Sequence, residues 1–77
     1  ASFTDVMTLL SLRKGKLSIV RIDLPEGSPV VNRKVKDIKL PKDTVLVSIL
    51  RGEEFLVPRG DTVLLFGDEV IAVANIE

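Results

Sequence analysis

The chain contains no cysteine, histidine, tryptophan or tyrosine, and these absences exclude several classes of function. Without cysteine there are no disulfides and no thiolate metal sites. Without histidine the chain lacks the usual general base, most zinc ligand sets and the Ser-His and Cys-His nucleophile pairs. Ser48 has no base within predictable reach, and no motif pairs two carboxylates. The sequence therefore predicts a protein that is not an enzyme, with no metal site and no cofactor.

Net charge, aromatic side chains and long apolar runs are also scarce. Eleven basic and eleven acidic residues cancel, so no net field attracts a polyanion. Phe55 and Phe66, two of only three aromatic residues, sit inside apolar strand patterns rather than beside a basic groove. No apolar run approaches the roughly 20 residues that cross a bilayer. We expect no nucleic-acid binding, no direct membrane insertion and a cytoplasmic location. A small β-barrel that binds RNA or protein would need exposed aromatic residues and a basic face.

Aliphatic residues are abundant for so short a chain. Of the 77 residues, 45% are apolar, whereas a domain of this size buries only about 60% of the surface of its unfolded chain. The excess predicts that a second copy, or the rest of a larger protein, covers part of the apolar surface. The start at Ala1, without an initiator methionine, indicates an excised or processed fragment.

Hydrophobic periodicity predicts the elements. Residues 2–12 have apolar residues at helical spacing behind a Thr-Asp N-cap, which predicts a short helix or a linker from an upstream domain. We therefore divide the chain into an N-terminal helix or linker over 1–14 and one domain over 15–77. Val31, Val35 and Ile38 fall at i, i+4 and i+7, and they predict a second short helix that begins near Asn32. Five runs are predicted as strands, namely residues 17–24, 44–50, 55–57, 63–66 and 70–76.

The strand patterns also predict which side chains share a face. In residues 17–24, Val20, Ile22 and Leu24 occupy one face, and Leu17 and Ile19 occupy the other. Residues 44–50 place three β-branched side chains on one face: Val45, Val47 and Ile49. Gly- and Pro-bearing turns separate the later runs, as in antiparallel hairpins. The predicted order of elements is therefore a helix or linker, a strand, a helix and four further strands.

Two groups of residues are candidates for binding. Five of the eleven cations fall between residues 33 and 42; they either grip a phosphate-bearing ligand or acidic partner, or form the solvated face of the helix. Arg51, at a hairpin edge, either contacts a ligand or pairs with a nearby carboxylate. The ligand-binding candidates are Arg33, Lys34, Lys36 and Arg51. The dimer-interface candidates are Val31, Val35, Ile38, Val45, Val47 and Ile49. The acidic residues from 53 to 69 are scattered through turns, where carboxylates usually bond nearby amides rather than Ca²⁺.

A series of short motifs occurs in a characteristic order along the chain. The motifs are Ser28-Pro29, Ile38-x-Leu40-Pro41, Val47-x-Ile49-x-Arg51, Pro58-x-Gly60-Asp61-Thr62-x-Leu64 and Gly67-Asp68-x-Val70. With these motifs, residues 17–73 resemble the TrkA-C domain, also called RCK-C, a C-terminal regulatory module of potassium transport and channel proteins. The resemblance implies that residues 15–77 form a regulatory domain of the α+β class, a small antiparallel sheet built from β-hairpins with one or two short helices, which dimerises. This domain would lie downstream of a nucleotide-binding domain and be attached to a membrane transporter or channel subunit.

The resemblance also implies two alternative functions. One is a regulatory, ligand-sensing dimerisation module of a cation transport system, in which a small anionic ligand or a divalent cation shifts the dimer conformation. The other is an assembly domain that couples transporter subunits without binding a ligand. Some members of the family bind cyclic di-AMP through an Asp-x-Arg pair and a downstream Asn. Here the matching stretch reads Lys39-Leu40-Pro41, followed by Val45-Leu46-Val47, which argues against that ligand. The location would be cytoplasmic, peripheral to the inner face of the membrane only through a transporter partner.

Overall fold

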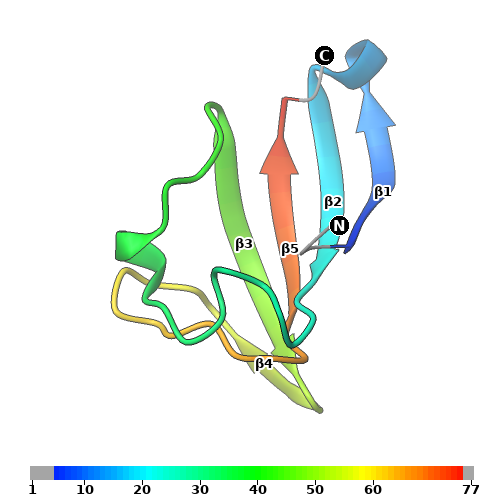
Figure 1. Cartoon of the computed structure of the whole chain (residues 1–77). Coiled ribbons are helices and arrows are strands. Elements are labelled where there is room, and N and C mark those ends of the chain that lie inside the picture. Colours follow the sequence, from blue (N-terminus) through cyan, green and yellow to red (C-terminus); the bar gives the residue numbers. More distant parts are fainter. Residues whose placement is uncertain (1–4, 76–77) are drawn as a thin grey trace.

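A single antiparallel sheet forms the framework of the protein. The structure is a computed structural model, and it describes residues 5–75. Five strands line up in the order β1-β2-β5-β3-β4, with every neighbouring pair antiparallel (Figure 1). Their bounds are β1 Asp5–Leu12, β2 Leu17–Asp23, β3 Thr44–Arg51, β4 Glu54–Leu56 and β5 Glu69–Ala74. Four of the five predicted strands are thereby confirmed to within about two residues at each described end; residue 76 lies outside the described range.

The prediction of an N-terminal helix was wrong. Residues 5–12 form β1, which pairs with β2 from Asp5↔Asp23 to Leu12↔Leu17. A tight 3₁₀ turn, Arg13–Gly15, joins the two strands with positive φ at all three of its residues. The leucine-rich run is compatible with a helix or a strand. A helix of only two turns is marginally stable because its nucleation is unfavourable. Pairing with β2 satisfies the same backbone groups with hydrogen bonds to a strand that is already in place.

The helix predicted from Asn32 was also wrong. Only a 3₁₀ turn forms, at Val35–Asp37, and no α-helix occurs within residues 5–75. The amides of Asn32, Val35 and Lys36 instead donate to the carbonyls of residues 64, 62 and 60, at 2.7, 2.9 and 2.9 Å. The apolar side chains do recur at helical spacing, but these backbone amides form hydrogen bonds with residues 60–64 rather than with the carbonyls four residues earlier, as a helix would require. The strand predicted over 63–66 is correspondingly reduced to one bridge, between Lys34 and Val63.

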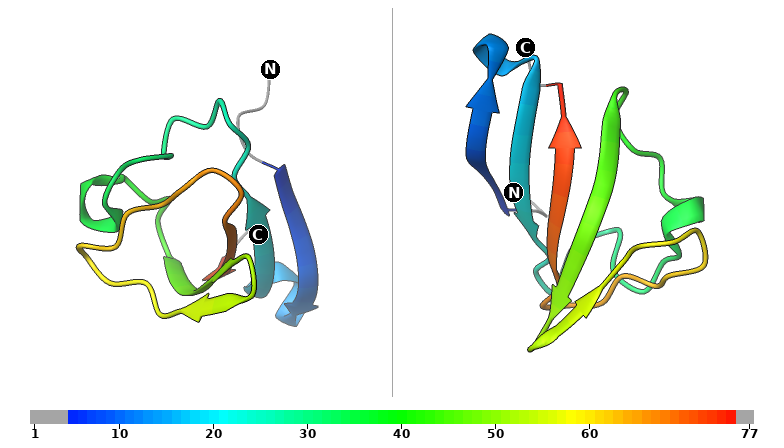
Figure 2. Two further views of the ribbon diagram at one scale, coloured as in Figure 1. Left: turned by 90° about the horizontal axis from the view of Figure 1, so that it is seen from below. Right: turned by 180° about the vertical axis from the view of Figure 1, so that it is seen from behind.

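The two long connections cover one face of the sheet. Residues 24–43 and 57–68 lie together on that side (Figures 1 and 2). Leu24 and Leu64 from these connections pack with Ile49 and Val70 from the sheet, and each is at most 4% exposed. The predicted common face of Val20, Ile22 and Leu24 is confirmed, because Val20 and Leu24 are buried and Ile22 packs against this core. Within the described residues, no helix is long and apolar enough to cross a membrane.

A β-bulge explains why the predicted face of β3 was wrong. Leu46 pairs with Ala72 and Ser48 pairs with Ile71, which leaves Val47 as an extra residue. One inserted residue exchanges the two faces of a strand beyond that point. Val45 and Val47 are therefore 63% and 46% exposed, whereas Ile49 is fully buried.

Candidate functional site

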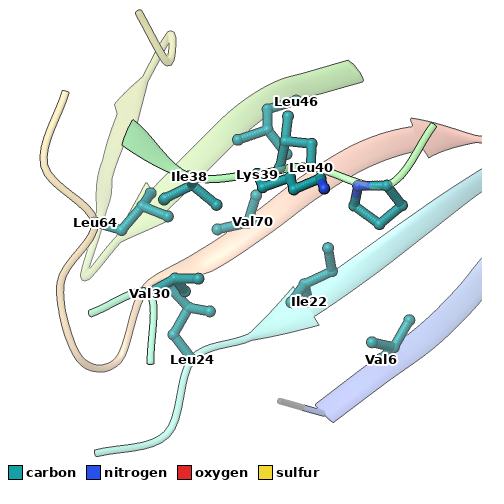
Figure 3. A pocket seen from close by; sticks show the side chains of 11 residues that line it. Val6, Ile22, Leu24, Val30, Ile38, Lys39, Leu40, Leu46, Leu64 and Val70 are labelled. Carbon is teal, nitrogen blue, oxygen red and sulfur yellow. The ribbon is translucent and has the colours of Figure 1, made fainter. Parts of the chain in front are cut away.

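A cavity of about 280 Å³ opens between the sheet and the connection that covers it. β1, β2, β5 and β3 contribute Val6, Ile22, Val70 and Leu46, and the side chains of residues 38–41 close the opposite wall (Figure 3). The remaining lining residues come from the covering connections: Leu24, Val30 and Leu64. The sheet thus supplies a fixed floor, and an irregular segment without regular secondary structure supplies the other side.

The chemistry of the cavity is almost entirely aliphatic. Lys39 is the one ionisable residue among those that line it, and it is exposed. Such a lining suits a small apolar body with an anionic group near Lys39. It offers no set of hydrogen-bonding side chains that would read a nucleotide base. Sequence reasoning missed most of this lining, because aliphatic cavity residues follow the same pattern as core residues.

The predicted cationic cluster is partly assembled on the outer surface. The Nζ atoms of Lys34 and Lys36 lie 3.9 and 2.9 Å from the same Asp61 Oδ1, and all three side chains are about half or more exposed. Arg33 donates to the carbonyl of Asp37 at 2.7 Å. These cations are thus already engaged with an acid or a carbonyl. Exposed pairs of this kind contribute little to stability, about 0–1 kcal/mol. A competing anion can therefore displace the Asp61 carboxylate from the two lysines.

Arg51 is engaged separately, with a buried carboxylate. Its Nε donates to Asp68 Oδ1 at 2.9 Å, and its NH2 donates to Asp68 Oδ2 and the Val63 carbonyl, both at 2.8 Å. The Leu65 amide donates to the same carboxylate at 2.9 Å. The Asp68 side chain is fully buried, whereas the Arg51 side chain is 31% exposed. The pair fastens the end of β3 to the 64–68 turn, the role of a structural clamp.

The clamp lowers the pKa of Asp68. Burial of the carboxyl by itself raises the pKa, but hydrogen bonds from Arg51 and Leu65, together with the Arg51 charge, outweigh burial and hold the pKa below its usual value. Since the folded pKa lies below the unfolded one, the stabilisation is present above the unfolded pKa and is lost as the pH falls through the folded pKa.

We therefore expect the free energy of unfolding to decrease on acidification below about pH 5, partly through Asp68. Urea unfolding at a series of pH values measures this dependence. In Asp68→Asn the free energy of unfolding should depend less steeply on pH, because the asparagine side chain does not titrate. Identical pH slopes in the two proteins would contradict the assignment to Asp68.

The other predicted site residues are distributed unevenly. Val31, Val35 and Ile38 are half-buried and pack against the core, and Ile49 lies within it, so these four have little surface to offer a partner. Of the six interface candidates, Val45 and Val47 are the two classed as exposed. Residues 5–75 contain no group of three or more acidic side chains placed to hold a metal ion.

Comparison with known proteins places the chain in a family. The model of the TrkA-C domain matches residues 19–77. The chain is 40% identical over 73 residues, 95% of its length, to the Trk system potassium uptake protein TrkA of Mycobacterium tuberculosis, of which it covers 33%. It is 38% identical over 63 residues, 82% of its length, to a TrkA homolog of Archaeoglobus fulgidus, of which it covers 14%. The chain thus spans a third or less of these relatives, and within that span it belongs to the TrkA-C domain family.

Proposed function

We propose that this chain is a regulatory, ligand-sensing and dimerising module of a potassium transport system. Its membership of the TrkA-C family, with relatives named as potassium uptake proteins, is the observation that carries the proposal. In this proposal residues 1–14 lead from an upstream nucleotide-binding domain, and residues 15–77 regulate a membrane transporter or channel subunit on its cytoplasmic side. A ligand that fits one dimer conformation better than another shifts the population, and the attached gating domain responds.

The cavity beside Lys39 is the candidate site for the ligand. Its aliphatic floor comes from four strands, so an occupant would bridge the sheet and the 38–41 segment. A ligand that holds those two parts in one arrangement can bias a conformational equilibrium by its difference in affinity. The surface cations Arg33, Lys34 and Lys36 form a secondary candidate for an anionic ligand, if the anion displaces Asp61.

An assembly domain without a ligand is the second candidate function. The specific observation in its favour is that Lys34, Lys36 and Arg51 are all paired with carboxylates, and that the cavity is almost devoid of polar groups. In that case the domain couples subunits, and sensing belongs to another part of the transport system.

Thermal unfolding at fixed protein concentration distinguishes the two functions. The compounds to test are cyclic di-AMP, ATP, ADP, NADH, Ca²⁺, Mg²⁺ and octanoate, the last as a probe of an aliphatic cavity with a nearby cation. A ligand at about 100 times its Kd adds about 2.7 kcal/mol of stability. For a chain of this size each kcal/mol raises the Tm by roughly 4–8 °C. We expect a Tm increase with at least one anionic compound.

Three lysine variants locate the site. Lys39→Ala should abolish the increase, whereas Lys42→Ala, an exposed lysine three residues further along, should retain it. An increase that survives Lys39→Ala but is lost in Lys36→Ala would move the site to the surface cations. No increase with any compound would reject ligand sensing by this chain and favour the assembly domain.

A further inference from the structure

The turn between β1 and β2 carries three cations within four residues. Arg13, Lys14 and Lys16 are all exposed, whereas Gly15 between them is buried. The φ angles of residues 13, 14 and 15 are 54°, 56° and 93°, so three consecutive residues adopt the left-handed conformation. This conformation is uncommon for residues with a side chain, and here it keeps Gly15 inside while the charged residues stay in solvent. We call Arg13, Lys14 and Lys16 the basic tip.

The basic tip has no acidic side chain paired with it. Within residues 5–75, no ion pair involves any of its three cations. The acidic residues Asp23, Glu54 and Glu69 lie at the opposite end of the sheet, near the β3–β4 turn (Figure 1). The seven residues of β2 separate the two ends by about 20 Å. Salt at about 0.1 M screens charges over roughly half that distance, so the tip acts as a local positive surface although the net charge is zero.

Exposed leucines flank the basic tip. Leu12 pairs with Leu17 at the base of the turn, and Leu10 pairs with Ile19 on the same face. Leu10, Leu12 and Leu17 are 49%, 45% and 43% exposed. The apolar patch is confined to this end of the hairpin, because Arg21 lies on the same face further along β2. The hairpin thus ends in an amphipathic surface, with cations at the turn and aliphatic side chains directly behind them.

The shape of this hairpin favours a lipid surface over a peptide as its partner. Residues 9–17 contribute nothing to the lining of the cavity. A peptide that extended the sheet would have to pair with the outer edge of β1, and the bulge at Leu9 interrupts that edge. A lipid surface needs neither a groove nor a regular strand edge. It accepts cations among its phosphates and aliphatic side chains at the boundary between headgroups and acyl chains.

We propose that the β1–β2 hairpin binds the surface of a membrane that contains anionic phospholipids. The basic tip contacts the headgroup phosphates, and Leu12 and Leu17 enter the interfacial layer without crossing the bilayer. Each Lys or Arg near an anionic surface strengthens binding by roughly fivefold, so one hairpin binds reversibly. The inference goes beyond the proposed function, in which the domain meets the membrane only through a transporter or channel subunit.

Flotation of the 77-residue chain with lipid vesicles tests the role of charge. We expect vesicles of phosphatidylcholine with about 30% phosphatidylglycerol to bind the chain at least about tenfold more strongly than phosphatidylcholine alone. Lys14→Gln/Lys16→Gln should weaken binding to the anionic vesicles by about 10–30-fold. The matched control Lys34→Gln/Lys36→Gln removes two exposed lysines at the same spacing from the covering connection, and it should change binding less than about twofold. Circular dichroism confirms that both variants are folded.

An introduced tryptophan tests the insertion of the leucines. The native chain contains no tryptophan, so the fluorescence of Leu12→Trp reports on this position alone. Its emission should shift to shorter wavelength when anionic vesicles are added, because the indole ring then leaves water for the membrane interface. Phe55→Trp is the control, since Phe55 is 64% exposed and lies in β4, at the opposite end of the sheet. Its emission should not change.

Several results would overturn the inference. These are absence of binding to anionic vesicles, equal binding to both kinds of vesicle, or an equal loss in the two double variants. Binding of a poly-glutamate peptide instead of vesicles, lost in Lys14→Gln/Lys16→Gln, would assign the tip to an acidic protein segment. A wavelength shift in Phe55→Trp but not in Leu12→Trp would place the contact elsewhere. The ligand-dependent Tm increase tests the proposed function separately, since it is measured without lipid.

Discussion

Arg51→Met should lower the free energy of unfolding by about 3–5 kcal/mol at neutral pH. The substitution keeps much of the side-chain volume but leaves the Asp68 carboxylate fully buried with the Leu65 amide as its remaining donor. A domain of this length has a total stability of roughly 4–12 kcal/mol, so the loss is a large part of it. Urea denaturation at fixed protein concentration, followed by circular dichroism, measures the change.

Arg59→Met is the matched control for this prediction. Arg59 is exposed, and its backbone amide rather than its side chain makes the hydrogen bond to Thr62. We expect its effect to stay within about 0.5 kcal/mol. Acidification should narrow the difference between Arg51→Met and the native chain, because a protonated Asp68 no longer carries an uncompensated charge. A loss below about 1 kcal/mol at neutral pH would mean that Arg51 is not the clamp.

Ile49→Ala should destabilise the domain by about 2–5 kcal/mol. Ile49 has no exposed surface and packs with Leu24, Leu64 and Val70. Together these four residues form the core that joins the sheet to both covering connections. Truncation leaves a cavity that these neighbours fill only in part. With roughly 4–8 °C for each kcal/mol, the Tm should fall by at least about 8 °C.

Two further substitutions calibrate the effect of Ile49→Ala. Ile49→Val removes one methyl group and should cost about 0.5–1.5 kcal/mol. Val57→Ala removes apolar atoms from a residue that is 53% exposed, and it should change the stability by less than about 0.5 kcal/mol. Equal effects of Ile49→Ala and Val57→Ala would contradict the assignment of Ile49 to the core. They would instead restore it as a candidate for the dimer interface.

The prediction for Ile49 shows where strand patterns are insufficient. Val45, Val47 and Ile49 alternate regularly in the sequence, and regular alternation predicts a shared face. The bulge at Val47 arises from the way β3 pairs with β5, and no local residue type signals it. The two valines thus become surface residues and the isoleucine a core residue.

The two predicted helices show the same limit. The apolar spacing in residues 5–12 and 31–38 fits a helix, yet β1 pairs with β2, and residues 32–36 bond to residues 60–64. Short helices are marginal by themselves, so a backbone partner from a distant part of the chain decides the outcome. Such a partner is known only once the fold brings the two segments together.

Local chemistry in the sequence by itself determined four of the five strands predicted from residue 17 onward, the common face of Val20, Ile22 and Leu24, and the membership of the TrkA-C family. These features depend on β-branched runs, glycines and prolines, which act over a few residues. Only the tertiary structure decided the pairing of β1, the partner of Arg51, the position of the cavity and the separation of a covered from an open face. Each of these depends on contacts between segments far apart in the chain. Side chains with the same pattern in the sequence then become core, cavity wall or open surface according to which backbone lies opposite them.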